Sequence, residues 1–264
     1  MFNLTPTVRN LLLINIAVYL LQQVESLHLT QLGSLYPLGS PFFRPWQFLT
    51  HMFMHANLLH IFSNMFGLIN FGPLLEQRWG GQRFLTFWLI CGIGAGALYE
   101  GVRTYEMRQL ATAYETVVRE PDAANFVDFM KQVGIGKEAY EPAAAALERN
   151  ATDPQLRQGV VENVRQLYTE LLQSPGGGML GASGALFGVL FAFGYLFPNT
   201  ILMLLFPPIP LKAKYFVGLY ALYELYSGVH RTPGDNVAHF AHIGGLVIGF
   251  VLIKIWERGR GQFY

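Results

Sequence analysis

Ser183 is a candidate nucleophile at the start of a long apolar segment. No charged residue occurs from Leu180 to Phe197, and a segment of this length and composition can enter a bilayer as a helix. A lone serine in such a helix usually bonds a carbonyl one turn earlier or allows a neighbouring helix to approach closely. Catalysis therefore becomes the better interpretation only if a base and hydrogen-bond donors occur elsewhere in the chain.

Two candidate donors open the second apolar segment of the chain. Asn57 is the predicted N-cap of this helix, which places His60 in the first turn and Asn64 one turn deeper on the same face. His51 and His55 precede the cap and are expected in or near a loop. His60 and Asn64 can both donate hydrogen bonds to a developing oxyanion.

The candidate base lies in the last apolar segment. At 100° per residue His242, Gly245 and Gly249 fall within about 60° of one another, so the imidazole stands above a glycine-lined face. Gly184 and Gly188 offer a matching flat surface beside Ser183. Because small residues allow close helix approach, we expect the serine helix and the histidine helix to touch.

The four polar side chains are expected to share one depth in the membrane. Each of the three helices that carry them would run inward from the outer side, with His60, Asn64, Ser183 and His242 near the outer ends. A nucleophile, a base and two donors are the minimum set for acyl transfer. Neither the serine segment nor the histidine segment contains an acidic residue at this depth, so the simplest assignment is a Ser-His pair without a carboxylate.

The composition indicates a membrane protein with one soluble insert. Hydrophobic residues make up 52% of the chain and charged residues only 13%, against roughly 25% charged in soluble domains. Of the 18 Lys and Arg and 17 Asp and Glu, residues 104–175 hold 7 and 11. The net charge of +1 gives no sign of nucleic-acid binding.

The predicted fold is an all-α, polytopic membrane bundle of six transmembrane helices. The apolar segments lie at about 8–24, 57–75, 83–103, 180–197, 213–229 and 237–256. Residues 1–103 would hold three spans and an interfacial first loop, 104–175 an extracytoplasmic insert, and 176–264 the last three spans. The first and last parts would form one domain.

The insert is predicted to be a small bundle of helices. Pro121, the pair of Gly134 and Gly136, and the turn before Pro154 divide it. The predicted helices are Glu106–Glu120, Asp122–Val133, Lys137–Arg149 and Pro154–Gln173. No ligand set is evident in the insert, and residues 176–178 are expected to form a glycine turn that leads to Ser183.

The distribution of positive charge predicts the orientation. With both termini in the cytoplasm, eight Lys and Arg outside the insert lie on the inner side and three on the outer side. The insert and the opening of the active site then face outward, since long loops translocate largely regardless of charge. The expected location is a bacterial-type plasma or inner membrane.

Other kinds of site fit the residues less well. The pairs His51 with His55 and His239 with His242 have helical ligand spacing, but no acidic ligand or His-Glu-x-x-His motif accompanies them, so no metal and no cofactor are expected. A soluble hydrolase needs Gly-x-Ser-x-Gly after a strand, and here Ala185 replaces the second glycine. A transporter is disfavoured because its polar residues would line a path across the membrane.

Taken together, these motifs resemble the rhomboid family of intramembrane serine proteases. The resemblance covers nearly all of the chain except the insert. It rests on Arg44-Pro45-Trp46, His51/His55/His60/Asn64, Gly72-x-x-x-Glu76-x-x-x-Gly80, Gly181-Ala-Ser183-Gly184 and Ala241-His242-x-x-Gly245-x-x-x-Gly249.

The resemblance implies roles for individual residues. Ser183 would be the nucleophile and His242 its general base. His60, Asn64 and the backbone N–H of Ser183 would form the oxyanion hole. Phe187 would lie against the catalytic histidine. His55, His51, Gly181 and Gly245 would support these groups, while the role of His239 stays open.

The resemblance also implies the activity and its partners. The expected function is hydrolysis of peptide bonds in or near the transmembrane segment of single-span membrane proteins, which enter laterally near the fifth span. Membrane lipid is the other expected partner, and the sequence does not indicate an oligomeric state. The alternative is a non-proteolytic membrane chaperone or substrate-binding protein, although relatives of that kind typically lack the serine or the histidine.

Overall fold

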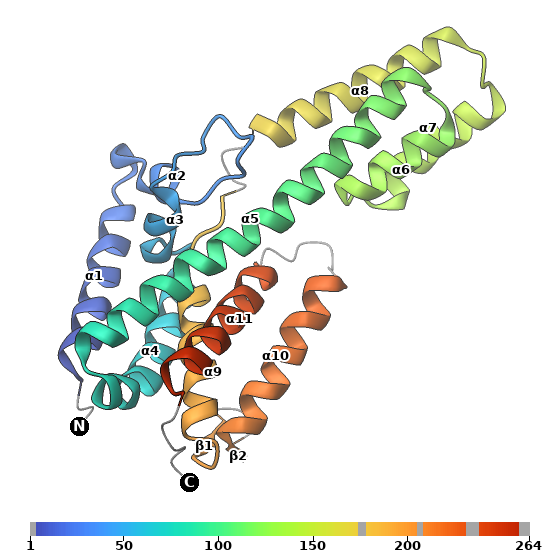
Figure 1. The fold of residues 1–264 in the computed structure, drawn as a ribbon. Coiled ribbons are helices and arrows are strands. Elements are labelled where there is room, and N and C mark those ends of the chain that lie inside the picture. Colours follow the sequence, from blue (N-terminus) through green and yellow to red (C-terminus); the bar gives the residue numbers. More distant parts are fainter. Residues whose placement is uncertain (1–3, 174–177, 205–207, 231–237, 259–264) are drawn as a thin grey trace. The chain divides into compact units, whose positions relative to one another are not determined.

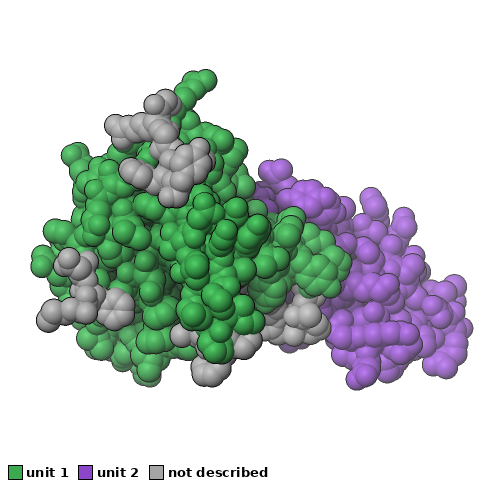
Figure 2. All heavy atoms as spheres, turned by 90° about the horizontal axis from the view of Figure 1, so that it is seen from below, with its two compact units in different colours: residues 1–36, 42–100, 178–264 green, residues 37–41, 101–177 purple. Residues whose placement is uncertain are grey.

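The computed structural model describes residues 4–173, 178–204, 208–230 and 238–258, which form two compact units (Figure 2). Unit 1 comprises Met1–Tyr36, Phe42–Glu100 and Gly178–Tyr264, and unit 2 comprises Pro37–Pro41 and Gly101–Gly177. Gly176 and Gly177 of the predicted glycine turn lie outside the described residues.

Unit 1 carries every residue of the candidate site, most of them on its helices and the others in the segments that join them. Its elements are α1 (Pro6–Gln22), η1 (Glu25–Leu27), α2 (Leu29–Gly33), α3 (Gln47–Thr50), η2 (His51–Phe53), α4 (Leu58–Trp79), the first part of α5 (Gly81–Arg119), α9 (Ser183–Leu196), β1 (Ile201–Met203), β2 (Pro210–Lys212), α10 (Ala213–Val229) and α11 (His239–Trp256) (Figure 1). The short antiparallel pair β1–β2 precedes α10 and departs from the all-α prediction.

Helix α9 is the central helix of unit 1. It packs against α4, α10 and α11, and ten of its fourteen residues are buried. A Cβ atom added at Gly249 would lie 2.9 Å from Gly188 Cα, and one at Gly245 would overlap the carbonyl oxygen of Gly184. The prediction that the serine helix and the histidine helix touch is therefore confirmed, and the contact is between backbones.

The helices of unit 1 include several that can cross a membrane. Among the described residues, α4, α5 and α11 are long and apolar enough, and α1 together with the segment Glu25–Gly33 makes a fourth if this pair, bent by 100°, counts as one span. Helix α9 is apolar but has only 14 residues. The chain is thus a helical membrane protein with three or four spans identified by length and composition.

The carboxylate of Glu76 holds α1 against α4. It accepts hydrogen bonds from the hydroxyl of Thr5 and from the backbone N–H groups of Thr7 and Val8, at 2.8 and 2.9 Å for the last two. The two N–H groups belong to the first turn of α1, where backbone donors are free and a negative charge is favoured. Glu76, near the end of α4, therefore caps one helix from the side of another, which explains why an acid is buried there.

The loop between α1 and α4 is ordered by a buried amide. Gln47 Nε2 donates to the carbonyl of Phe42 at 3.0 Å, and Gln47 Oε1 accepts from the N–H of Arg44 at 3.0 Å. Within this loop, Leu35 pairs with Met179 through two backbone hydrogen bonds of 2.8 Å. This isolated bridge fixes the chain four residues before Ser183.

Unit 2 contains the rest of α5 with α6 (Ala123–Val133), α7 (Lys137–Arg149) and α8 (Pro154–Gln173). The last three helices lie where the sequence predicts them. Their buried side chains and those of α5 form a separate core that includes Val117, Phe129 and Val164. The prediction that the third span ends at about residue 103 and that a separate helix begins at Glu106 is wrong, because α5 is one helix of 39 residues. Residues 102–119 contain neither proline nor glycine, so nothing in the sequence interrupts the helix.

Candidate active site

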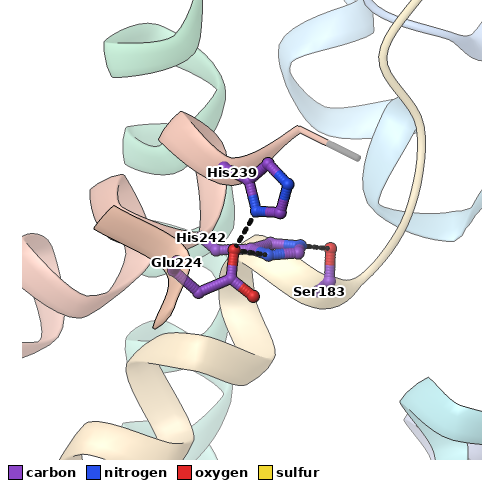
Figure 3. Close-up of polar contacts among 4 residues, drawn as sticks. All are labelled: Ser183, Glu224, His239 and His242. Atoms are coloured by element: carbon purple, nitrogen blue, oxygen red, sulfur yellow. Dashed lines mark hydrogen bonds and ion pairs between the residues drawn. The ribbon is translucent and has the colours of Figure 1, made fainter. Parts of the chain in front are cut away.

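Ser183 and His242 meet at the contact between α9 and α11. Ser183 is the first residue of α9, and its Oγ lies 2.8 Å from His242 Nε2, within hydrogen-bond distance (Figure 3). His242 lies in the first turn of α11 and is only 9% exposed. The hydroxyl therefore has an imidazole nitrogen positioned to take its proton.

The imidazole is held from one face by an aromatic ring. Phe187 stacks on His242 with ring centroids 4.2 Å apart and planes 10° from parallel. Tyr220 of α10 in turn packs on Phe187 at 4.9 Å. Since Phe187 lies one turn after Ser183 on α9, the same helix positions both the hydroxyl and the ring that orients the base.

Glu224 of α10 is the site residue that the sequence analysis did not find. Its Oε2 lies 2.8 Å from Nδ1 of His242 and 2.6 Å from Nδ1 of His239, and the residue is 2% exposed (Figure 3). The prediction that His242 has no carboxylate beside it is therefore wrong. The serine and histidine segments contain no acid at this depth, and the carboxylate comes instead from a third helix.

A signal for Glu224 was present in the sequence. It is the only acidic residue in the apolar segment 213–229. Ionisable side chains inside membrane helices generally face the bundle interior and pair with another polar group. This rule predicts a buried polar partner for Glu224, and the histidines of the last apolar segment can supply one.

His60 lies against the glycine that precedes Ser183. A Cβ atom at Gly181 would lie 2.8 Å from Cε1 and Nε2 of His60, and Gly181 has a φ of +129°. A side chain at this position would be both strained and obstructed. The N–H of Gly181 donates to the carbonyl of His51 at 2.9 Å, so the loop before α4 also holds this turn.

Asn64 follows His60 by one turn on α4, and the Asn57 side chain accepts from the His60 N–H at 2.9 Å as the predicted N-cap. Asn64 is 4% exposed, and its Nδ2 has no acceptor among the described residues. A buried amide donor that no protein group satisfies is rare. It is suited to a ligand or reaction intermediate that supplies the acceptor.

His51 is the first residue of η2, and His55 lies between η2 and α4. His51 Nδ1 is 2.8 Å from the carbonyl of Gln47, and the ring of His55 packs edge-on against His60 with centroids 5.1 Å apart. Burial lowers the pKa of each to about 4, helped at His55 by the neighbouring His60. Both rings are therefore neutral at pH 7, and His55 bears on the site by supporting His60.

Glu224, His239 and His242 are also the described groups best placed to bind a metal, since their ligand atoms lie within 4.8 Å of one another. The separations of 2.6 and 2.8 Å between Oε2 and the two Nδ1 atoms are hydrogen-bond distances. Ligands about 2.0–2.1 Å from a tetrahedral metal ion lie farther apart, at roughly 3.3 Å. The arrangement fits hydrogen bonding better than metal binding.

Comparison with known proteins identifies the family. The family model of the Rhomboid domain matches residues 43–110 and 156–258, which is more than half of the chain and includes the whole candidate site. The chain belongs to the rhomboid family. This rhomboid is a helical integral membrane protein, and the expectation drawn from the motifs is confirmed at the level of the family. The match leaves out residues 111–155, which lie within unit 2.

Individual relatives are distant or match over short stretches. An uncharacterized mitochondrial rhomboid protein of Schizosaccharomyces pombe is 26% identical over 221 residues, which cover 81% of this chain and 52% of that protein. RHOMBOID-like protein 6, mitochondrial, of Arabidopsis thaliana is 42% identical over 53 residues, 20% of this chain and 17% of that protein. Rhomboid-like protease 3 of Toxoplasma gondii is 31% identical over 62 residues, 24% of each chain. The chain thus spans about half the length of the yeast relative.

Proposed function

We propose that this rhomboid is an intramembrane serine endopeptidase that cleaves single-span membrane proteins in or near their transmembrane segment. The observation that carries the proposal is the 2.8 Å separation of Ser183 Oγ and His242 Nε2 at the contact of two buried helices. Rhomboids are typically intramembrane proteases, and one relative above is named a protease. A protein that only binds membrane segments has no need of a hydroxyl aligned with a base.

The proposed reaction uses residues of three helices. His242 Nε2 accepts the proton of Ser183 while Oγ attacks the peptide carbonyl carbon, and the carbonyl oxygen becomes an oxyanion. His60, Asn64 and the backbone N–H of Ser183 donate to that oxyanion. The tetrahedral intermediate breaks when His242 returns the proton to the leaving amine. Water, activated by His242, then hydrolyses the acyl-enzyme.

The proposed membrane arrangement has six spans with both termini in the cytoplasm. Helices α9 and α10, of 14 and 17 residues, would complete the set within the bundle, where a short helix can be buried against longer neighbours. Ser183, His242 and His60 all lie in the first turn of their helices. The site then opens to the outer side of a bacterial-type plasma or inner membrane, where water can reach it.

The proposal is tested with the purified protein in liposomes together with a single-span reporter rich in small residues. We expect cleavage of the reporter, and we expect a fluorophosphonate probe to abolish it by adding once, at Ser183, as located by peptide mass spectrometry. An intact reporter and an unlabelled Ser183, under conditions that label an active rhomboid, would instead favour the non-proteolytic alternative.

Asn64→Ala is expected to lower kcat by roughly 10²–10³-fold with little change in KM, because the lost amide donates to the oxyanion only during the reaction. The matched control is Asn70→Ala on the same helix. Asn70 is exposed, and its Nδ2 donates to the Phe66 carbonyl one turn earlier. The measurement is the cleavage kinetics of both variants with the reporter. Equal kcat values would show that Asn64 does not donate to the oxyanion.

A further inference from the structure

We propose that Glu224 is a positioning residue for His242, so that this rhomboid uses a Ser-His-Glu arrangement in place of a Ser-His pair. The inference rests on the proposed proteolytic function and deepens it. The carboxylate comes from α10, the imidazole from α11 and the hydroxyl from α9, and the three groups follow one another through contacts of 2.8 Å and 2.8 Å (Figure 3).

The hydrogen bonds at Glu224 fix the direction of donation. A single oxygen, Oε2, lies 2.6 Å from Nδ1 of His239 and 2.8 Å from Nδ1 of His242. An ionised carboxylate oxygen accepts two hydrogen bonds, whereas a protonated one could donate only one. An ionised Glu224 that accepts a hydrogen bond from each imidazole satisfies both contacts in the same way.

The tautomer of His242 follows from this arrangement. A neutral imidazole carries one proton, and Glu224 holds it on Nδ1. Nε2 then has a free lone pair, and it is Nε2 that lies 2.8 Å from Ser183 Oγ. Glu224 thereby keeps His242 in the form that can accept the serine proton. The opposite tautomer would point a proton at Oγ and could not act as base.

The charge of Glu224 also acts during the reaction. When His242 takes the serine proton it becomes an imidazolium, and a carboxylate 2.8 Å from Nδ1 stabilises this cation. Glu224 is 2% exposed, so little solvent screens the interaction. Among the described residues, polar groups near this pair include His239 on α11, Tyr220 on α10, Ser183 on α9 and His60 on α4.

His239 has a separate part in this arrangement. A buried carboxylate is costly unless hydrogen bonds stabilise it, and His239 supplies a second donor at 2.6 Å. Its ring is 4% exposed and lies edge-on to that of His242, with centroids 6.3 Å apart. His239 thus keeps the carboxylate ionised and in place while His242 changes its charge.

A merely structural tie between α10 and α11 is the competing explanation, because the bond from His239 to Glu224 alone would join these helices. The two explanations differ at Glu224→Gln. The glutamine keeps the shape but can present its N–H₂ to His242 Nδ1, which favours the wrong tautomer and removes the charge. A positioning role predicts a loss in kcat, whereas a structural tie predicts a loss in stability shared with His239→Leu.

The test compares four proteins in liposomes with the same reporter: wild type, Glu224→Gln, Glu224→Asp and His239→Leu. We expect Glu224→Gln to lower kcat by roughly 10²–10⁴-fold with KM within about threefold. Glu224→Asp retains the charge and should recover part of this loss. His239→Leu leaves the bond from His242 to Glu224 and should lose roughly tenfold or less. Wild-type kcat in Glu224→Gln, or equal losses in Glu224→Gln and His239→Leu, would overturn the inference.

A second measurement reads the tautomer in the wild-type protein and does not depend on activity. In wild-type protein labelled with ¹⁵N-histidine, His242 should show a protonated Nδ1 and an unprotonated Nε2, assigned by comparison with His242→Asn. The opposite tautomer would overturn the positioning role even if the protein cleaves its reporter. The expected tautomer in a protein that fails to cleave would reject the proposed function and leave the arrangement at Glu224 intact.

Discussion

Ser183→Ala is expected to lower reporter cleavage by roughly 10⁵-fold or more, to the background of the assay. The nucleophile has no substitute in the site, because His60 and Asn64 only donate and His242 without the hydroxyl has nothing to activate except water. The fold should survive, since Ser183 makes no side-chain cap to its own helix and its neighbour Ala182 is the N-cap. The measurement is single-turnover cleavage in liposomes, with melting temperature recorded in parallel.

Ser63→Ala is the matched control for this experiment. Ser63 is exposed on α4, and its hydroxyl donates to the His60 carbonyl within the same helix. Removing it should leave the cleavage rate within about twofold, as expected for a surface substitution. Cleavage by Ser183→Ala at the wild-type rate would place the chemistry elsewhere and reject the proposed mechanism.

Much of the site could be predicted because local rules determine it. The N-cap at Asn57 sets where α4 begins and therefore where His60 lies, and one turn of helix places Phe187 after Ser183. The glycine faces of α9 and α11 predicted their contact because helix geometry decides which residues share a face. These features depend on spacing within a segment, which the sequence displays directly.

The features that were missed depend on which segments become neighbours. Glu224 is 41 residues from Ser183 in the sequence, and no spacing rule relates the two; the packing of α10 against α9 and α11 brings them together. The bridge between Leu35 and Met179 joins segments more than 140 residues apart in the same way. Such pairings arise from the tertiary fold, and only the acidic residue in an apolar segment gave a hint of one.

The site depends on three helices remaining in contact. Displacing α10 from α11 would withdraw Glu224 from both histidines, and displacing α11 from α9 would separate His242 from Ser183. The first contact is made by buried polar groups and the second by glycines. The contacts that pack these helices therefore also hold the reacting groups in place, so a purely steric change at a contact should act on the reaction.

Gly245→Ala tests this dependence and is expected to lower kcat by at least roughly 10²-fold. The added methyl group would overlap the carbonyl oxygen of Gly184, a backbone atom that no rotamer change can move, so α9 and α11 must separate. Displacement of reacting groups by about 1 Å can cost on the order of 10²-fold in rate. Overpacking should also destabilise the protein by about 1–3 kcal/mol.

Gly101→Ala is the control that separates this steric effect from helix propensity. Gly101 lies within α5, and a Cβ there would meet nothing within 4 Å. The same substitution should therefore stabilise the protein by up to about 1 kcal/mol and leave kcat unchanged. Cleavage kinetics and thermal unfolding of both variants give the comparison.

A Gly245→Ala protein with the wild-type rate would show that the hydroxyl and the imidazole do not depend on the close approach of their helices. An inactive protein with an unchanged melting temperature would show instead that the methyl group disturbs the site without separating the helices.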